Sequence, residues 1–430
     1  MTAGYPLQRR IENALRSLER YTKTDMVYLA SGGFWLALDQ VGGALMAFGL
    51  AIAFAHFMPK EVYGTYRYLL SAFWTLTAFT LTGLPTAVSQ AVARGKEGAY
   101  KTTLWPSIIA GIPLALISLG TSAYYFVQGN AAFGSAFIVI AVFGPFIQPS
   151  YLFGSFLAGR KDYRTSSLFG LILYAIPSVA LFATMFVSTN PILFLGIYLA
   201  SNVAAGTLLT VATLIFWRPN DVPDPGVRKL GGHFSAMNLL STIAQQIDKI
   251  VVFHYLGAVE LAVYAFATAL PEQIKGIFNS ISILALPKFV ARPFREVRAN
   301  FWNRLWLLTG GMTVIALVYI VIAPLAFTLF FPAYREAIFY SQIYALSLIP
   351  IGNALPLTLL QAHEAKRELY LFNILAPVFQ IGTLIFFTSW YGLIGAIVAR
   401  IAGRVWNLMV GGILLAAYER RLSTGKDILP

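Results

Sequence analysis

The sequence contains no cysteine among its 430 residues, which excludes disulfide bonds and thiolate metal sites. Charged residues are scarce as well, at 11% of the chain against about 25% in an average soluble domain. Hydrophobic residues, by contrast, make up 58%. A soluble protein of this size needs a charged exterior around its core, and this composition cannot supply one. The chain is therefore predicted to be a membrane protein.

Enzyme signatures are missing too. The sequence has no glycine-rich P-loop and no His-Glu-x-x-His zinc motif. The stretches between its apolar blocks are also too short to hold a glycosyltransferase domain. We therefore expect no enzyme activity, no cofactor and no metal site.

What the sequence has instead is a series of long apolar blocks between Ser31 and Tyr418. A bilayer core of about 30 Å takes about 20 helical residues, so the chain has room for about twelve spans. The blocks are apolar on every face, whereas membrane strands alternate in polarity. We predict an all-α polytopic membrane protein with spans near residues 30–57, 64–90, 103–127, 132–157, 166–187, 192–217, 234–256, 261–286, 304–329, 337–360, 370–388 and 392–417.

Basic residues concentrate in alternate loops. The opposite loops hold only Lys60 and Arg335. Because Lys and Arg favour the cytoplasmic side, we expect a multi-pass protein of the cytoplasmic (inner) membrane with both termini in the cytoplasm. This bias, with attraction to anionic membrane lipids, explains the net charge of +13, so we expect no nucleic acid partner. The basic loops contain Arg94, Lys96, Lys101, Arg160, Lys161, Arg164, Arg218, Arg228, Lys229, Lys288, Arg292, Arg295, Arg298, Lys366 and Arg367.

The N-terminal segment, residues 1–28, has the pattern of an amphipathic helix. Leu7, Ile11, Leu15 and Leu18 share one helical face, and the arginines lie mostly elsewhere. Such a helix is expected to lie on the inner membrane surface.

The remaining chain divides at a central stretch rich in proline and glycine. We predict a six-helix bundle over residues 29–217, a cytoplasmic linker over 218–233 and a second six-helix bundle over 234–417. Residues 418–430 are expected to form a cytoplasmic tail.

The two halves show weak internal similarity. His56 ends the first predicted span and Tyr66 follows it, while His254 and Tyr264 hold the same places around the seventh span. The offset of about 200 residues corresponds to six spans, so both halves keep the same orientation. Parallel repeats of this kind are common in secondary transporters, whose site lies between the halves.

Several segments resemble a known family. Residues 57–66 and 82–85 look like the first hairpin of the polysaccharide flippases, and residues 248–249, 256–257 and 263–265 look like their seventh span. These flippases belong to the multidrug/oligosaccharidyl-lipid/polysaccharide exporter (MOP) superfamily. The resemblance implies two six-helix bundles in a V and lipid-linked oligosaccharide substrates.

Charges inside the predicted spans mark candidate site residues, since each costs about 3 kcal/mol or more in hydrocarbon. Arg400 and Arg404 are four residues apart and share a helical face, which Asn407 continues. They could line a cavity and bind diphosphate oxygens through their forked donors. Alternatively they pair with a buried acid such as Asp39.

Two further pairs and one isolated acid complete the candidates. Lys275 follows Glu272 by three residues, so the two form either a self-neutralising pair or a phosphate site with a releasable partner. Lys249, beside Asp248, either lines the cavity or supports the fold. Asp39 is either a coupling site for H⁺ or Na⁺ or the counter-charge of a buried arginine.

Together these features predict a flippase that moves polyprenyl-diphosphate-linked oligosaccharide by alternating access. Its partners would include glycosyltransferases or a glycan polymerase, and its energy source an ion gradient or consumption of the glycan. The main alternative is an ion-coupled small-molecule or multidrug exporter of the same fold. A membrane scaffold is a further alternative, which the two similar halves and the buried charges disfavour.

The predicted topology can be tested with a single cysteine, because the chain has none of its own. A cysteine introduced at Asn220 should resist impermeant thiol reagents in intact cells and react after the membrane is opened. Labelling from outside intact cells would contradict the predicted orientation.

Overall fold

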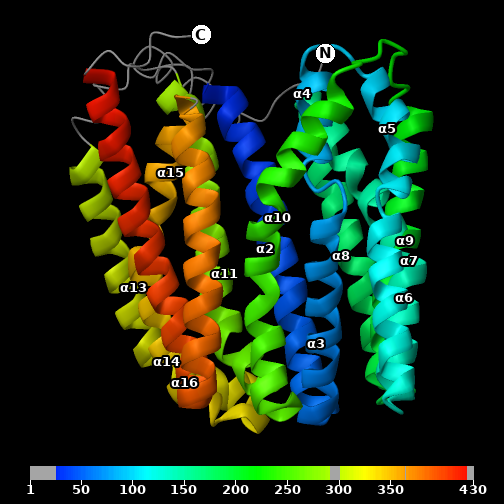
Figure 1. Ribbon diagram of the computed structural model, residues 1–430, viewed down its shortest axis with the longest axis vertical. Coiled ribbons are helices and arrows are strands. Elements are labelled where there is room, and N and C mark those ends of the chain that lie inside the picture. The colour runs from blue at the N-terminus through cyan, green and yellow to red at the C-terminus, as the bar shows by residue number, and fades with distance from the viewer. Residues whose placement is uncertain (1–25, 291–300, 364, 424–430) are drawn as a thin grey trace, which may run out of the picture.

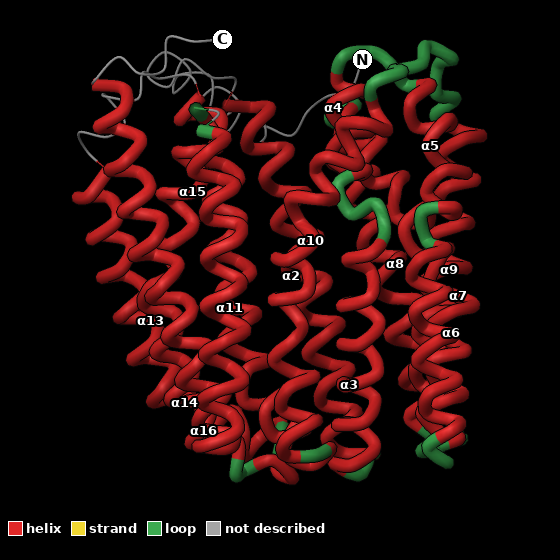
Figure 2. Tube along the Cα trace, viewed as in Figure 1, coloured by secondary structure: helices red, strands yellow, loops and turns green. Residues whose placement is uncertain are grey.

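The structure is a computed structural model that describes residues 26–290, 301–363 and 365–423. Within these ranges the chain forms α-helices joined by short 3₁₀ turns and loops, with no β-strand (Figure 2). The predicted all-α architecture is therefore confirmed. The predicted amphipathic segment at the N-terminus and the end of the tail lie almost entirely outside the described residues.

The first half of the chain forms the elements on the right of Figure 1, with α2 near the middle. They are α2 (Met26–Phe57), α3 (Lys60–Leu76), η1 (Thr77–Phe79), α4 (Leu84–Ala93), α5 (Gly98–Ile109), α6 (Ile112–Val127), α7 (Ala131–Gly159), α8 (Tyr163–Met185) and α9 (Pro191–Phe216).

The second half forms the elements on the left of Figure 1, with α10 crossing the middle. They are α10 (Val227–Leu256), α11 (Ala258–Val290), α13 (Phe301–Phe330), η2 (Pro332–Tyr334), α14 (Ala337–Ala345), η3 (Leu346–Asn353), α15 (Ala354–Ala362) and α16 (Lys366–Ser423).

These elements make the twelve predicted crossings. Eight helical segments of the described chain are long and apolar enough to span a membrane. The broken segment α3–η1–α4, the polar helix α10 and the helix α11 add three more. The last crossing arises because α16 turns back at Gly392, whose φ of +59° favours glycine.

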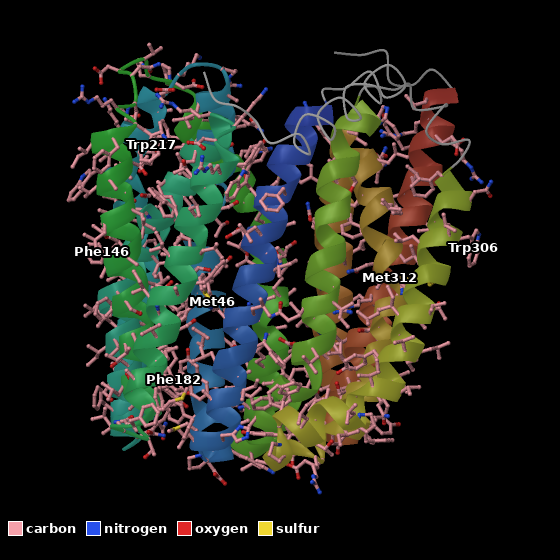
Figure 3. All side chains as sticks on the ribbon, turned by 180° about the vertical axis from the view of Figure 1, so that it is seen from behind. Met46, Phe146, Phe182, Trp217, Trp306 and Met312 are labelled. Carbon is pink, nitrogen blue, oxygen red and sulfur yellow. The ribbon has the colours of Figure 1, made fainter. Side chains whose placement is uncertain are left out.

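Large apolar side chains cover the outside of the molecule, as expected of a surface that faces lipid. Phe146 and Trp306 lie at opposite outer edges of the molecule, on different halves (Figure 3), and both are exposed. In water such a surface would be unfavourable, but hydrocarbon solvates it.

The repeat predicted from sequence appears in the helix ends. Helix α2 ends at Phe57 and α10 ends at Leu256, while α3 begins at Lys60 and α11 begins at Ala258. Both halves therefore begin with a long helix that is followed closely by a second one, in the same order and at an offset of about 200 residues.

Helix α10 begins at Val227, earlier than the predicted start at residue 234. The prolines of the linker all precede Val227, and the glycines that follow are tolerated within the helix. Gly231 has a structural reason to be there, since a Cβ at this position would lie 2.9 Å from a methyl of Leu84. The connection outside helices is therefore shorter than predicted.

The linker is bound to the first half by ion pairs. Arg160 donates to both oxygens of Glu97 at 2.6 and 2.7 Å, and the backbone N–H of Asn220 donates to the same carboxylate at 2.9 Å. Arg94 donates to Asp224 at 2.9 Å. The hydrogen bonds from Arg160 hold the pKa of Glu97 below its usual value. The linker thus belongs structurally to the first half.

The two halves share one hydrophobic core at the end of the molecule away from the termini (Figure 1). There the ring of Tyr63 lies 4.9 Å from that of Phe266, which lies 3.9 Å from that of Tyr334. Lys60 forms an ion pair with Glu336 at 2.5 Å. These contacts join α3 to α11 and to the loop after α13, and they close this end.

At the end near the termini each half has a core of its own. One core contains Leu84, Tyr100 and Phe156 of the first half, and the other contains Phe301 and Leu415 of the second. The halves therefore share one core at the closed end. At the other end their cores are separate, and α10 packs against α4, where the N–H of Gly83 donates to Oγ of Ser235 at 2.9 Å.

The closed end depends on a glycine. A Cβ on Gly64 of α3 would lie 1.8 Å from the carbonyl oxygen of Ala258 in α11, so no larger residue fits. We expect Gly64→Ala to destabilise the closed state by about 1–3 kcal/mol, the usual cost of overpacking. Gly49→Ala in α2 is the control, because a Cβ there meets nothing within 4 Å. Equal thermal stability of the two purified variants would contradict this prediction.

Candidate functional site

Six charged side chains from three helices meet within the second half. Asp248 and Lys249 lie on α10, Glu272 and Lys275 on α11, and Arg400 and Arg404 on the limb of α16 that follows Gly392. The spacing of four residues places both arginines on one face of α16. All six are residues that the sequence marked as candidates.

Arg404 is the most enclosed of the four basic residues, with 7% of its surface exposed. Its Nη1 donates to the hydroxyl of Ser347 at 2.6 Å and to the carbonyl oxygen of Ser347 at 3.1 Å. Its Nη2 donates to Glu272 and, at 3.1 Å, to the hydroxyl of Tyr344. The guanidinium is therefore held by both the η3 segment and α11.

Glu272 is the centre of the cluster. Besides Arg404, its carboxylate accepts from the hydroxyl of Tyr344 and lies 3.2 Å from Nζ of Lys275. Its Oε1 also lies 3.6 Å from Nη2 of Arg400. One carboxylate thus contacts three cations, which leaves the group with a net positive charge.

Asp248 is the second acid of the cluster and is more deeply buried than Glu272. Tyr264 donates to its Oδ2 at 2.8 Å, and the same oxygen lies 3.5 Å from Nε of Arg400. Nζ of Lys249 lies 3.5 Å from Oδ1 and donates to Gln246 at 3.0 Å. Asp248 is buried, so these contacts compensate a charge that would otherwise be costly.

A cavity of about 390 Å³ lies beside the cluster. Among the described residues that line it, three are basic and none is acidic. Lys249 does not line it. The lining consists of Ser241, Ala244, Gln245, Lys275, Phe372, Ala376, Pro377, Gln380, Arg400, Arg404 and Asn407. A surface of this kind can bind an anion through charge-assisted hydrogen bonds.

Asp39 lies elsewhere, on α2. Its carboxylate packs against Gly170 of α8, where a Cβ would lie 2.3 Å from Oδ1, and Oδ1 has no hydrogen-bond partner among the described residues. The hypothesis that Asp39 neutralises Arg404 is therefore wrong, because the acid beside Arg404 is Glu272. Sequence spacing shows which residues share a helix face but does not show which helices are neighbours.

Sequence reasoning also missed Ser347 and Tyr344. Ser347 lies in η3, where a 3₁₀ pattern would pair its carbonyl with the backbone nitrogen of Pro350, which has no hydrogen. The carbonyl is therefore free to accept from Arg404. The proline inside the tenth predicted span was the signal that could have indicated this acceptor.

The ion pair between Arg404 and Glu272 predicts a specific pattern of stability. Arg404→Ala leaves Glu272 short of its main partner and should cost about 3 kcal/mol, the lower end for a buried pair. Adding Glu272→Gln should restore most of this loss, whereas adding Asp39→Asn should not. Thermal unfolding of the purified variants measures both effects. Recovery by Asp39→Asn instead would contradict the observed pairing.

Comparisons with known proteins agree with this architecture. The family described as "Polysaccharide biosynthesis protein" matches residues 29–291, more than half of the chain. No curated protein is similar to the chain at a significant level.

Solved structures share the fold at low sequence identity. An inward-facing multidrug resistance MATE family transporter of the MOP superfamily is 15% identical, with a TM-score of 0.66 over 88% of this chain and 96% of that one. An outward-facing one is 14% identical, with a TM-score of 0.64 over 91% and 95%. A MOP superfamily transporter from Pyrococcus furiosus is 13% identical, with a TM-score of 0.57 over 92% and 95%. The chain therefore belongs to the polysaccharide biosynthesis protein family, as its resemblance to the polysaccharide flippases implied, and it shares its fold with transporters of the MOP superfamily.

Proposed function

We propose that this protein translocates polyprenyl-diphosphate-linked oligosaccharide across the cytoplasmic membrane by alternating access. The observation that carries the proposal is the cavity, whose described lining has Lys275, Arg400 and Arg404 but no acid. A diphosphate is the anionic part of such a lipid, and it cannot cross about 30 Å of hydrocarbon unaided. Family membership supports the same substrate class.

The two arginines suit a diphosphate in geometry as well as in charge. Guanidinium groups present planar pairs of donors that match phosphate oxygens, and Lys275 adds a point charge. Gln245, Gln380 and Asn407 supply neutral polar groups on the same cavity wall. In this proposal the glycan occupies the space between the halves, and the prenyl chain stays in lipid.

Alternating access would come from rocking of the two predicted bundles, residues 29–217 and 234–417, against each other. The closed end, with Tyr63 and Phe266 in its shared core, supports this reading. With the orientation predicted by the positive-inside bias, the end near the termini faces the cytoplasm. The structure would then correspond to the state that receives substrate from the side of its synthesis, where glycosyltransferases and a glycan polymerase are candidate partners.

Asp39 is the candidate for ion coupling. No cation contacts Asp39 among the described residues, whereas Asp248 and Glu272 both form ion pairs. We propose that Asp39 binds H⁺ or Na⁺ during the cycle, because a carboxylate without a protein counter-charge needs another cation inside a membrane.

A small-molecule exporter remains the alternative, since the fold is shared with multidrug resistance MATE transporters. Cationic drugs would favour a cavity lined by acids, and the lining here is basic. The similar transporter from Pyrococcus furiosus is described as having a binding pocket of reverse polarity that suggests a different function. Pocket polarity is thus the feature that separates the two proposals.

The proposal is tested by flipping of a fluorescent lipid-linked oligosaccharide in proteoliposomes. Arg400→Ala/Arg404→Ala should slow flipping at least about 100-fold, because two charge-assisted contacts of about 1.5–3 kcal/mol each are lost. Arg404→Lys should keep part of the activity, since it retains the charge and the pairing with Glu272 but loses the fork. Arg335→Ala, an exposed arginine at the closed end, is the control. Normal flipping by a folded double variant would contradict the assignment.

A further inference from the structure

We propose that Glu272 is the anion that occupies the diphosphate site when the substrate is absent, and that it competes with the substrate for the same cations. This inference rests on the proposed function and assigns Glu272 a positioning role in release. The substrate would have to displace the carboxylate to bind, and the carboxylate would displace the substrate in return.

The contacts of Glu272 are those that an anionic ligand in the cavity would make. Its carboxylate accepts from Arg404, and it lies 3.6 Å from Arg400 and 3.2 Å from Lys275. These three residues are the basic residues of the described cavity lining. A carboxylate offers two acceptor oxygens, as does each O–P–O edge of a phosphate group, so the two ligands use the same donors.

The cations remain in place when Glu272 leaves them. Arg404 keeps two hydrogen bonds to Ser347, and Arg400 keeps Asp248 behind it at 3.5 Å. The site is therefore preorganised for an anion by contacts that do not involve Glu272. Exchange of one anion for another does not require the arginines to move.

Glu272 can also leave without becoming an isolated charge. Lys275 lies three residues further along the same helix and pairs with its other oxygen, Oε2. Both side chains of this pair are about one-third exposed, at 32% and 31%. The carboxylate can turn from Arg404 toward Lys275 while the substrate takes the arginines.

Asp248 provides the contrast. Its side chain is 3% exposed, it accepts from Tyr264, and it does not line the cavity. It serves as a fixed counter-charge, whereas Glu272 is exchangeable. Differences in affinity arise mostly from differences in the dissociation rate, so a substrate that binds too tightly is released too slowly. A competing carboxylate in the site lowers the affinity and thereby speeds release.

The test measures binding of geranylgeranyl diphosphate to the purified full-length chain in nanodiscs. Glu272→Gln keeps the size of the side chain and removes the competing charge, so it should bind at least about tenfold more tightly, or about 1.4 kcal/mol. It should also flip lipid-linked oligosaccharide more slowly at saturating substrate, because release becomes limiting. Glu260→Gln, in the first turn of the same helix, is the matched control and should leave affinity unchanged.

A folded Glu272→Gln protein with unchanged or weaker affinity would overturn the inference, and so would tighter binding with unchanged or faster flipping. If Glu272→Gln does not fold, Glu272→Asp tests the inference instead. Its shorter side chain keeps the charge but holds it further from Arg404, so geranylgeranyl diphosphate should bind a few-fold more tightly. Unchanged or weaker binding by folded Glu272→Asp would equally overturn the inference. A wild-type protein that binds no geranylgeranyl diphosphate would contradict the proposed function as well, whereas wild-type binding that these variants fail to tighten contradicts only the role of Glu272.

Discussion

The high cost of a charge in hydrocarbon governs the second half of this protein. A cluster of six charged side chains lies inside three of its helices, and each charge is compensated by the others nearby. Glu272 makes the largest number of these contacts, joining α11 to α16 through Arg404 and Arg400. The same arrangement places three of the cations and neither acid on the described lining of the cavity. The need to compensate charge and the capacity to bind an anion thus arise from one set of contacts.

The repeat gives the two halves a similar order of helices, but their functional residues differ. At the closed end, Gly64 of α3 lets the backbone of α11 approach closely, and an aromatic core seals the contact. This contact involves both halves, whereas the cationic cavity belongs to the second half alone. Movement about the closed end would therefore carry the whole ion cluster with one bundle, so that its internal pairs need not break.

Much of the fold could be predicted from the sequence, because apolar length and basic loops are properties of single segments. The twelve crossings, the repeat and the six charged residues are of this kind. Partner choice is not, since it depends on which helices are neighbours. The sequence suggests Asp39 as a partner of Arg404, yet Glu272 occupies that place. The acceptor at Ser347 could not be predicted either, because it exists only through the irregular turn around Pro350.

If the cavity selects an anion, the protein should prefer a negatively charged amphiphile to a positively charged one. Binding of geranylgeranyl diphosphate can be compared with binding of a trimethylammonium amphiphile that carries the same tail, at increasing salt concentration. The diphosphate should bind more tightly, and its affinity should fall as salt screens the cations of the cavity. Tighter binding of the ammonium compound would contradict an anion-selective cavity and would favour an exporter of cationic molecules.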